Sequence, residues 1–329
     1  MHLTPSIRRR HALTLVAGLL GGAIAPPVMA QDFPSRTIKL VVPFAAGGPA
    51  DVVAREFGQK LGAELAQSVV IENQGGGAGV TALGTVARAD ADGHTLLFAA
   101  SGNIVLQPQL TNAGGAELVA KLSPVSLVST SPHVLVVSSK LPVRSLEEFV
   151  AHARGHPGEL SYGSAGVGGV AHLGMAYLEA LTGTRMVHVP YRGTAGAVND
   201  LASGRVHALF SSYPSLQGVI EKGLVRPLGM TARTESGPAA KLPVIASVVP
   251  QFEYTTWYGL YAPAGTPQAA VRRLNAAVRK VATDASLRDK LSVQGVEMAA
   301  SSPSELQDLA KRDAQKWAEV IKRANIKLD

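Results

Sequence analysis

Cysteine is absent from the 329 residues of this chain. A chain without thiols forms no disulfide, has no thiolate nucleophile and builds no cysteine-based metal site. Attachment of a lipid to a cysteine behind an export signal is excluded for the same reason. The chemistry of this protein must therefore come from other side chains or from the main chain.

Aromatic and charged residues are also scarce. They make up 5% and 17% of the chain, whereas apolar residues make up 46%, a balance typical of a globular protein with a buried core. The formal charge is +7, but the only basic run is Arg8-Arg9-Arg10; without it, 28 basic residues stand against 24 acidic ones, which leaves +4. Dispersed basic residues and few stacking platforms argue against nucleic-acid binding.

The first thirty residues are typical of an export signal. The arginine run precedes about fourteen apolar residues from Ala12 to Ala25, too few to span a bilayer core about 30 Å thick. Val28-Met29-Ala30 then places compact residues where a signal peptidase cuts. We expect residues 1–30 to be a signal peptide cleaved after Ala30, and the mature protein to be soluble in the periplasm. The arginines match a twin-arginine signal only in part, so the export route stays open.

The rest of the chain alternates short β-branched runs with helical segments. This pattern is typical of βαβ units in an α/β fold with mostly parallel sheets flanked by helices. The length suits two lobes, and the segments 124–139 and 254–263 are expected to cross between them. We expect lobe 1 to comprise 31–132 plus 255–329, and lobe 2 to comprise 133–254. Two hinge crossings permit closure around a ligand while limiting other motions.

Three loops at the carboxyl ends of expected strands are candidates for the site. They are Ala46-Gly47-Gly48, Ser101-Gly102 and Ser164-Ala165-Gly166. In open α/β sheets ligands bind at such ends, where helix N-termini present N–H groups to anions. The loops are consistent with a small carboxylate held by main-chain amides, although each loop alone is equally consistent with an ordinary tight turn.

Other motifs point to weaker alternatives. The segment 166–171 matches a dinucleotide-binding fingerprint, but no acidic residue ends the following strand. Ser164 lacks the glycine two positions earlier that a nucleophile elbow requires, because Tyr162 stands there. An exported serine hydrolase stays an alternative. The histidines show no metal-ligand spacing, and His172 is the one we expect to contact a ligand. No cofactor or metal is expected.

Several motifs together resemble the Bug proteins, the extracytoplasmic receptors of tripartite tricarboxylate transporters. The matching segments, in chain order, are 42–51 (VPFAAGGPAD), 72–73 (EN), 91–97 (ADGHTLL), 160–166 (LSYGSAG), 187–193 (VHVPYRG) and 257–267 (WYGLYAPAGTP). The resemblance implies a two-lobed, type II periplasmic binding-protein fold that closes around its ligand like a Venus flytrap. It also implies that the protein is not an enzyme and that its partners are a small organic acid and the membrane components of such a transporter.

In the family, the first loop and the second glycine loop hold a carboxylate largely through main-chain groups and water. The candidate ligand-binding residues here are Phe44, Ala45, Ala46, Gly47, Gly48, Asp51, Ser101, Gly102, Ser164, Ala165, Gly166, His172, Tyr191, Thr194 and Ser211.

One departure from the family concerns the ligand. Many members have an aspartate and an asparagine after the phenylalanine that corresponds to Phe210, where this chain has Ser211-Ser212. Without that acid we expect a ligand that lacks an amine, such as a di- or tricarboxylate or an aromatic acid. We expect a monomer. A sensor of the same fold, acting in place of a transport receptor, stays an alternative.

Overall fold

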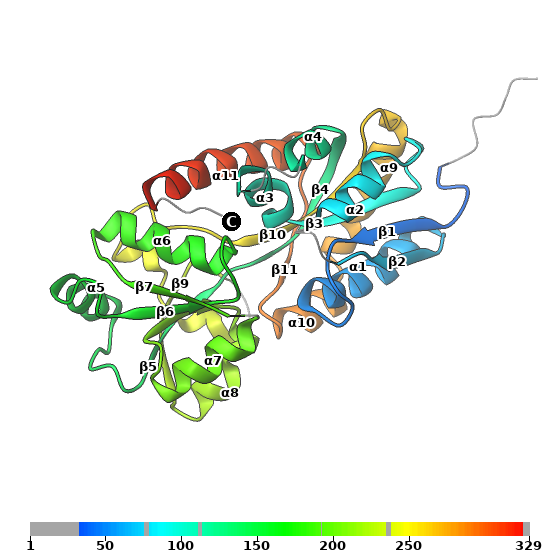
Figure 1. Cartoon of the computed structure of the whole chain (residues 1–329). Coiled ribbons are helices and arrows are strands. Elements are labelled where there is room, and N and C mark those ends of the chain that lie inside the picture. The colour runs from blue at the N-terminus through cyan, green and yellow to red at the C-terminus, as the bar shows by residue number, and fades with distance from the viewer. Residues whose placement is uncertain (1–32, 76–78, 111–113, 192, 235–237, 325–329) are drawn as a thin grey trace, which may run out of the picture. The chain divides into compact units, whose positions relative to one another are not determined.

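The computed structural model describes residues 33–75, 79–110, 114–191, 193–234 and 238–324. The expected signal peptide lies outside these ranges. The described chain contains two β-sheets, each covered by helices on both faces (Figure 1).

The six-stranded sheet has the strand order β11-β4-β10-β3-β1-β2. Its strands are β1 (Ile38–Val42), β2 (Val69–Asn73), β3 (Thr95–Ala100), β4 (Leu122–Ser131), β10 (Thr256–Pro263) and β11 (Glu297–Met298). The pairs β1–β2 and β1–β3 are parallel, whereas β10 runs antiparallel to both β3 and β4. Its helices are α1 (Pro49–Leu65), α2 (Val80–Ala87), α3 (Gln107–Leu110), α4 (Gly115–Ala120), α9 (Gln268–Ala282), α10 (Ala285–Ser292), α11 (Pro303–Ala324) and the π-helical turn η2 (Gly102–Leu106).

The five-stranded sheet has the order β7-β6-β8-β5-β9. Its strands are β5 (Val134–Ser138), β6 (Ser161–Ser164), β7 (Val187–Pro190), β8 (Ala208–Ser211) and β9 (Val225–Met230). Here β6 is parallel to β7 and β8, and β5 runs antiparallel to β8 and β9. The helical segments around it are α5 (Leu146–Gly155), α6 (Val170–Thr182), α7 (Thr194–Ser203), α8 (Tyr213–Glu221) and the short turns η3 (Pro238–Lys241) and η4 (Ile245–Ser247).

The two-lobed α/β fold expected from the sequence is confirmed, with one refinement. Each sheet is mixed, because the strand that enters it directly after a crossing, β5 or β10, runs against its neighbours. The crossings fall between β4 and β5 and between β9 and β10, and we propose the lobe boundaries at residues 133 and 255. Helix α11 contacts both β4 and α6, so it packs on the second sheet's helix layer as well as on the first sheet.

Successive side chains of a strand pack against different helix layers, one on each face of the sheet. In β1, Leu40 and Val42 face the cluster formed with α1 and α9, whereas Val41 faces the cluster formed with α2 and η2, as the two-residue period of a strand requires. A capping box begins α11, with Ser302 Oγ accepting from Glu305 N–H at 3.2 Å and Glu305 Oε2 accepting from Ser302 N–H at 2.7 Å.

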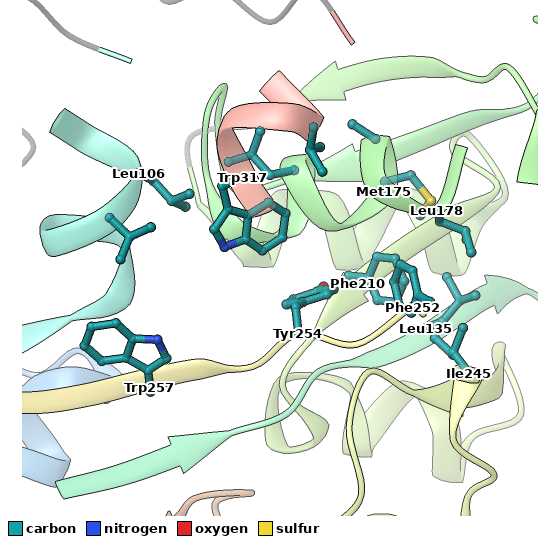
Figure 2. Packing of buried hydrophobic residues seen from close by; sticks show 14 of the residues in the cluster. Leu106, Leu135, Met175, Leu178, Phe210, Ile245, Phe252, Tyr254, Trp257 and Trp317 are labelled. Carbon is teal, nitrogen blue, oxygen red and sulfur yellow. The ribbon is translucent and has the colours of Figure 1, made fainter. Parts of the chain in front are cut away.

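One aromatic cluster continues from the first sheet to the second. Figure 2 shows Trp257 of β10, Trp317 of α11 and Tyr254 beside Phe210 of β8. The Trp257 indole N–H donates to Asp313 at 2.7 Å within this core, which satisfies the polar atom of the largest fully buried side chain. The core next to the two crossings is therefore built from buried, mostly apolar side chains.

Candidate functional site

The loop after β1 is shaped by Asp51, in the first turn of α1. The carboxylate is buried and accepts hydrogen bonds from Gly47 N–H at 2.8 Å, Arg55 Nε at 2.9 Å and Asn73 Nδ2 at 2.9 Å. Asn73 Nδ2 also donates to Phe44 O at 3.2 Å. The hydrogen bond from Arg55 is the largest of the causes that hold the pKa of Asp51 below its ordinary value. Asp51 therefore fixes the loop, and its own oxygens are occupied by protein donors.

The free donors of this loop belong to Ala45 and Ala46. Within the part of the chain that the structure describes, their N–H groups have no hydrogen-bond partner, and both residues are exposed. Gly47 gives its N–H to Asp51 and has a φ of +81°, a left-handed conformation that glycine adopts at little cost. Gly47 thus makes the turn, and the two alanines present the amides.

A cavity of about 410 Å³ opens against this loop. Its lining residues are Pro43, Phe44, Ala45, Gly79, Ala100, Gly102, Asn103, Gln107, Val170, Thr256 and Tyr258. None of them carries a formal charge, so an anion here would meet dipoles and hydroxyl groups. The volume is within the usual range for small-molecule sites.

The turn after β3 forms part of the same cavity. Gly102 lines it, and a Cβ atom added there would meet nothing within 4 Å. Ala100 N–H donates to Asn103 Oδ1 at 3.1 Å, which holds the turn. Ser101 is 4% exposed, so of the two predicted residues it is Gly102 that faces the space.

The second glycine loop, 164–168, connects β6 to α6. Ser164 at its start has no exposed surface. The Ser164 hydroxyl donates to Gly166 O at 2.9 Å, accepts from Gly166 N–H at 3.2 Å and lies 2.7 Å from His188 Nε2. Ser164 therefore shapes the loop from behind and is not presented to a ligand.

His172 supports this loop from the first turn of α6. Its Nδ1 accepts from Gly168 N–H at 3.0 Å, and its ring stacks on that of His188 with the centroids 3.8 Å apart. Desolvation is the largest cause that lowers the pKa of each histidine to about 4. Among the described residues, the N–H groups of Ala165 and Val167 have no partner, so these two amides are the free donors of the second loop.

Three further predicted residues lie at carboxyl ends of the second sheet. The Tyr191 hydroxyl donates to Asp200 at 2.7 Å, and desolvation followed by this bond raises the pKa of Tyr191 to about 12. Thr194 is the first residue of α7, and Ser211 is the last residue of β8 and is buried. None of the three lines the 410 Å³ cavity.

The structure thus brings only some of the predicted residues to one cavity. Phe44, Ala45 and Gly102 line it, and among the described residues the second sheet's elements contribute Val170 of α6 alone. Sequence reasoning missed Thr256 and Tyr258. They belong to β10, which was expected as a crossing strand, but its place beside β3 could not be read from residue spacing.

A larger cavity, of about 660 Å³, lies at the other side of α6. Its lining residues include Tyr162, His172, Glu179, Arg185, His188 and Arg323. Desolvation raises the pKa of Glu179 to about 7. Of the predicted ligand-binding residues this cavity contains His172 and none of the glycine-loop residues, so the cavity at the first loop is the better match to the predicted site.

The described residues include no group of three metal-ligating side chains placed to hold an ion. In the same part of the chain, the helices are all too short or too polar to cross a bilayer.

Comparison with protein families places residues 53–326 within the family described as tripartite tricarboxylate transporter family receptor. Protein BugT of Bordetella pertussis is 30% identical over 311 residues, which covers 93% of this chain and 94% of that protein. A protein encoded in the tcbD-tcbE intergenic region of Pseudomonas sp. strain P51 is 36% identical over 321 residues, with 96% and 94% covered.

Solved structures give the same result at the level of the fold. An R. palustris protein solved with adipate superposes with a TM-score of 0.76 at 34% identity, covering 90% of this chain and 99% of that one. MatC from Rhodopseudomonas palustris, solved with bound malate, gives a TM-score of 0.71 at 30% identity, with 88% and 100% covered.

Proposed function

Because this chain belongs to the tripartite tricarboxylate transporter receptor family, we propose that it captures a small organic acid in the periplasm for the membrane components of such a transporter. Members of the family are binding receptors and not enzymes. The serine hydrolase considered from the sequence is therefore set aside, and the burial of Ser164 agrees with this conclusion.

The observation that carries the proposal is the pair of free amides at the first loop. Ala45 and Ala46 lie just before Gly48, the N-cap of α1, at the end of the helix where the dipole adds positive potential. Asp51 in the same turn is neutralised by Arg55 at 2.9 Å, so its charge does not repel an approaching carboxylate. The residues that line the 410 Å³ cavity carry no formal charge.

A second carboxylate-binding surface is proposed at the loop 164–168. The N–H groups of Ala165 and Val167 are the corresponding donors from the second lobe. Closure of the lobes on their two crossings would place a dicarboxylate between the two pairs of amides. Relatives solved with adipate and malate support a ligand of this class.

The ligand is proposed to lack an amine. Ser211 ends β8 and Ser212 is the N-cap residue of α8, and neither supplies the negative charge that would pair with an ammonium group. A di- or tricarboxylate or an aromatic carboxylate is therefore preferred over an amino acid.

Export, assembly and partners belong to the same proposal. Residues 1–30 are the cleavable signal, the mature receptor acts as a monomer, and it delivers ligand to a tripartite transporter. A sensor of the same fold differs in one observable respect. Deletion of a transport receptor abolishes uptake of its ligand, whereas deletion of a sensor leaves the transport step itself in place.

Thermal unfolding of the refolded protein tests the proposal. Unfolding and refolding remove copurified ligand, and a true ligand at 100 times its Kd adds about 2.7 kcal/mol of stability, a shift of roughly 4 °C for a chain of this size. Glutarate and glutamate form a matched pair that differs by one amine. We expect dicarboxylates to raise the midpoint and glutamate to leave it unchanged; stabilisation by glutamate alone would contradict the proposal.

A further inference from the structure

Two histidines from separate elements meet behind the loop 164–168. His172 lies in α6 and His188 in β7, which Figure 1 shows beside β6. Their rings are 7° from parallel with centroids 3.8 Å apart, and Tyr162 packs beside the pair, with its ring centroid 5.0 Å from that of His188 and 6.2 Å from that of His172. Tyr162 and His188 are direct partners across β6 and β7, which places both side chains on the α6 face of the sheet.

Each imidazole holds a different end of the loop. His188 Nε2 contacts Ser164 Oγ at 2.7 Å, and Ser164 Oγ in turn bonds both polar main-chain groups of Gly166. His172 Nδ1 accepts from Gly168 N–H at 3.0 Å. The two rings, stacked on each other, therefore act as one rigid support for both ends.

The loop needs such a support because of its glycines. Gly166 and Gly168 have φ values of +146° and +72°, and glycine loses more conformational freedom than any other residue when it is ordered. The main chain between the two anchors carries the free N–H groups of Ala165 and Val167. Their direction depends on where the anchors hold the loop.

Protonation states follow from the contacts. Gly168 N–H can only donate, so His172 Nδ1 must carry a lone pair, and the neutral ring then bears its proton on Nε2. A proton on His188 Nε2 would allow Ser164 Oγ to accept from it and from Gly166 N–H while donating to Gly166 O. Desolvation, which lowers the pKa of both rings, keeps the pair neutral and stacked.

We propose that His172 and His188 are positioning residues for ligand binding, acting through Gly168 and Ser164 to aim the amides of Ala165 and Val167 at the carboxylate. This inference rests on the proposed function, in which the loop 164–168 faces the ligand. His172 thus acts from behind the loop, whereas the sequence suggested a direct contact.

Side chains that mimic one ring nitrogen provide the test. In His172→Asn the amide oxygen replaces Nδ1 as the acceptor, and in His188→Gln the amide nitrogen replaces Nε2. His172→Phe and His188→Phe keep an aromatic ring but remove the hydrogen bond. Kd values for adipate and malate are measured by calorimetry for all four, alongside urea unfolding without ligand.

We expect each phenylalanine variant to weaken binding at least about tenfold, the loss expected when one hydrogen bond to the loop is removed. The asparagine and glutamine variants should stay within about threefold of the wild type, even if all four lose stability. A residue that served stability alone would leave the Kd of the folded protein unchanged. Equal Kd values in the phenylalanine and amide variants would overturn the inference.

Gly166→Leu separates this inference from the proposed function. If the wild type binds no organic acid, or if Gly166→Leu binds as the wild type does, the proposed function of this loop fails and the inference fails with it. Loss of binding in Gly166→Leu with wild-type binding in His172→Phe overturns the inference alone. Nitrogen NMR of the wild type adds a check that does not need a folded variant: His172 should carry its proton on Nε2 at pH 7, and protonation on Nδ1 would contradict the assigned contact.

Discussion

Replacing Asp51 by asparagine should loosen the first loop without removing any atom that faces the ligand. The carboxylate serves three donors, on Gly47, Arg55 and Asn73. An asparagine has one acceptor oxygen, and its amide nitrogen must face at least one of these donors. Losing one charge-assisted hydrogen bond costs about 1.5–3 kcal/mol. The ion pair with Arg55, half exposed, adds about 1 kcal/mol at most.

Urea unfolding followed by circular dichroism measures this loss, expected near 2–3 kcal/mol at pH 7. The pKa of Asp51 is depressed in the folded state, so its contribution is present above its ordinary value of 3.8 and is lost as the pH falls through the lowered pKa. The difference between variant and wild type should therefore shrink in strong acid. Dicarboxylate affinity at pH 7 should fall roughly tenfold because Ala45 and Ala46 lose their fixed direction.

Asp284→Asn is the matched control. Asp284 caps α10 by accepting from Leu287 N–H at 2.8 Å and does not line the cavity. Asparagine caps helices about as well as aspartate, and the partly exposed ion pair of Asp284 with Lys60 at 2.9 Å is worth about 1 kcal/mol at most, so stability should fall by no more than that and affinity should not change. Wild-type stability and affinity in Asp51→Asn would refute the role assigned to Asp51.

Three further predictions concern the loops, the histidines and the core. Gly47→Leu should abolish dicarboxylate binding in calorimetry whereas Gly158→Leu, with the same φ of +81° and equally open surroundings, should only lose stability; equal Kd values would remove the first loop from the site. Since the pKa values of His172 and His188 are lowered to about 4 from 6.5, the unfolded chain binds protons first, and stability should fall between pH 6.5 and 4 by up to about 3 kcal/mol per ring. The urea midpoint of the doubly substituted His172→Asn, His188→Gln protein should vary less over that window. Trp257→Phe should lower the free energy of unfolding in urea by about 1–3 kcal/mol, because buried Asp313 Oδ2 loses its indole donor and keeps Lys316 as a partner on Oδ1 alone. Ligand affinity should not change.

The alternation of strands and helices predicted the architecture because each lobe is built from local βαβ units. The places of β5 and β10 were harder to predict. Both enter their sheets after a crossing and pair with strands far away in the sequence. Periodicity reports which face of a strand is buried but carries no information on its neighbours, so Thr256 and Tyr258 could not be placed at the cavity.

The turns of the candidate site were predictable from the sequence, whereas the main-chain atoms that stay free in them were not. Glycine content located the turns at Gly47 and Gly166, yet the N–H groups of both glycines are used inside the protein. Which amides stay free depends on Asp51 and Ser164, whose side chains fold back onto their own loops. Such short-range hydrogen bonds leave no distinct signature in residue type.

The location of a bound dicarboxylate tests the central claim most directly. An experimental structure of the protein with adipate or malate should show carboxylate oxygens at about 3 Å from the N–H groups of Ala45 and Ala46, with the other end at Ala165 and Val167. A carboxylate held instead by Arg185 and Arg323 in the larger cavity would contradict the account.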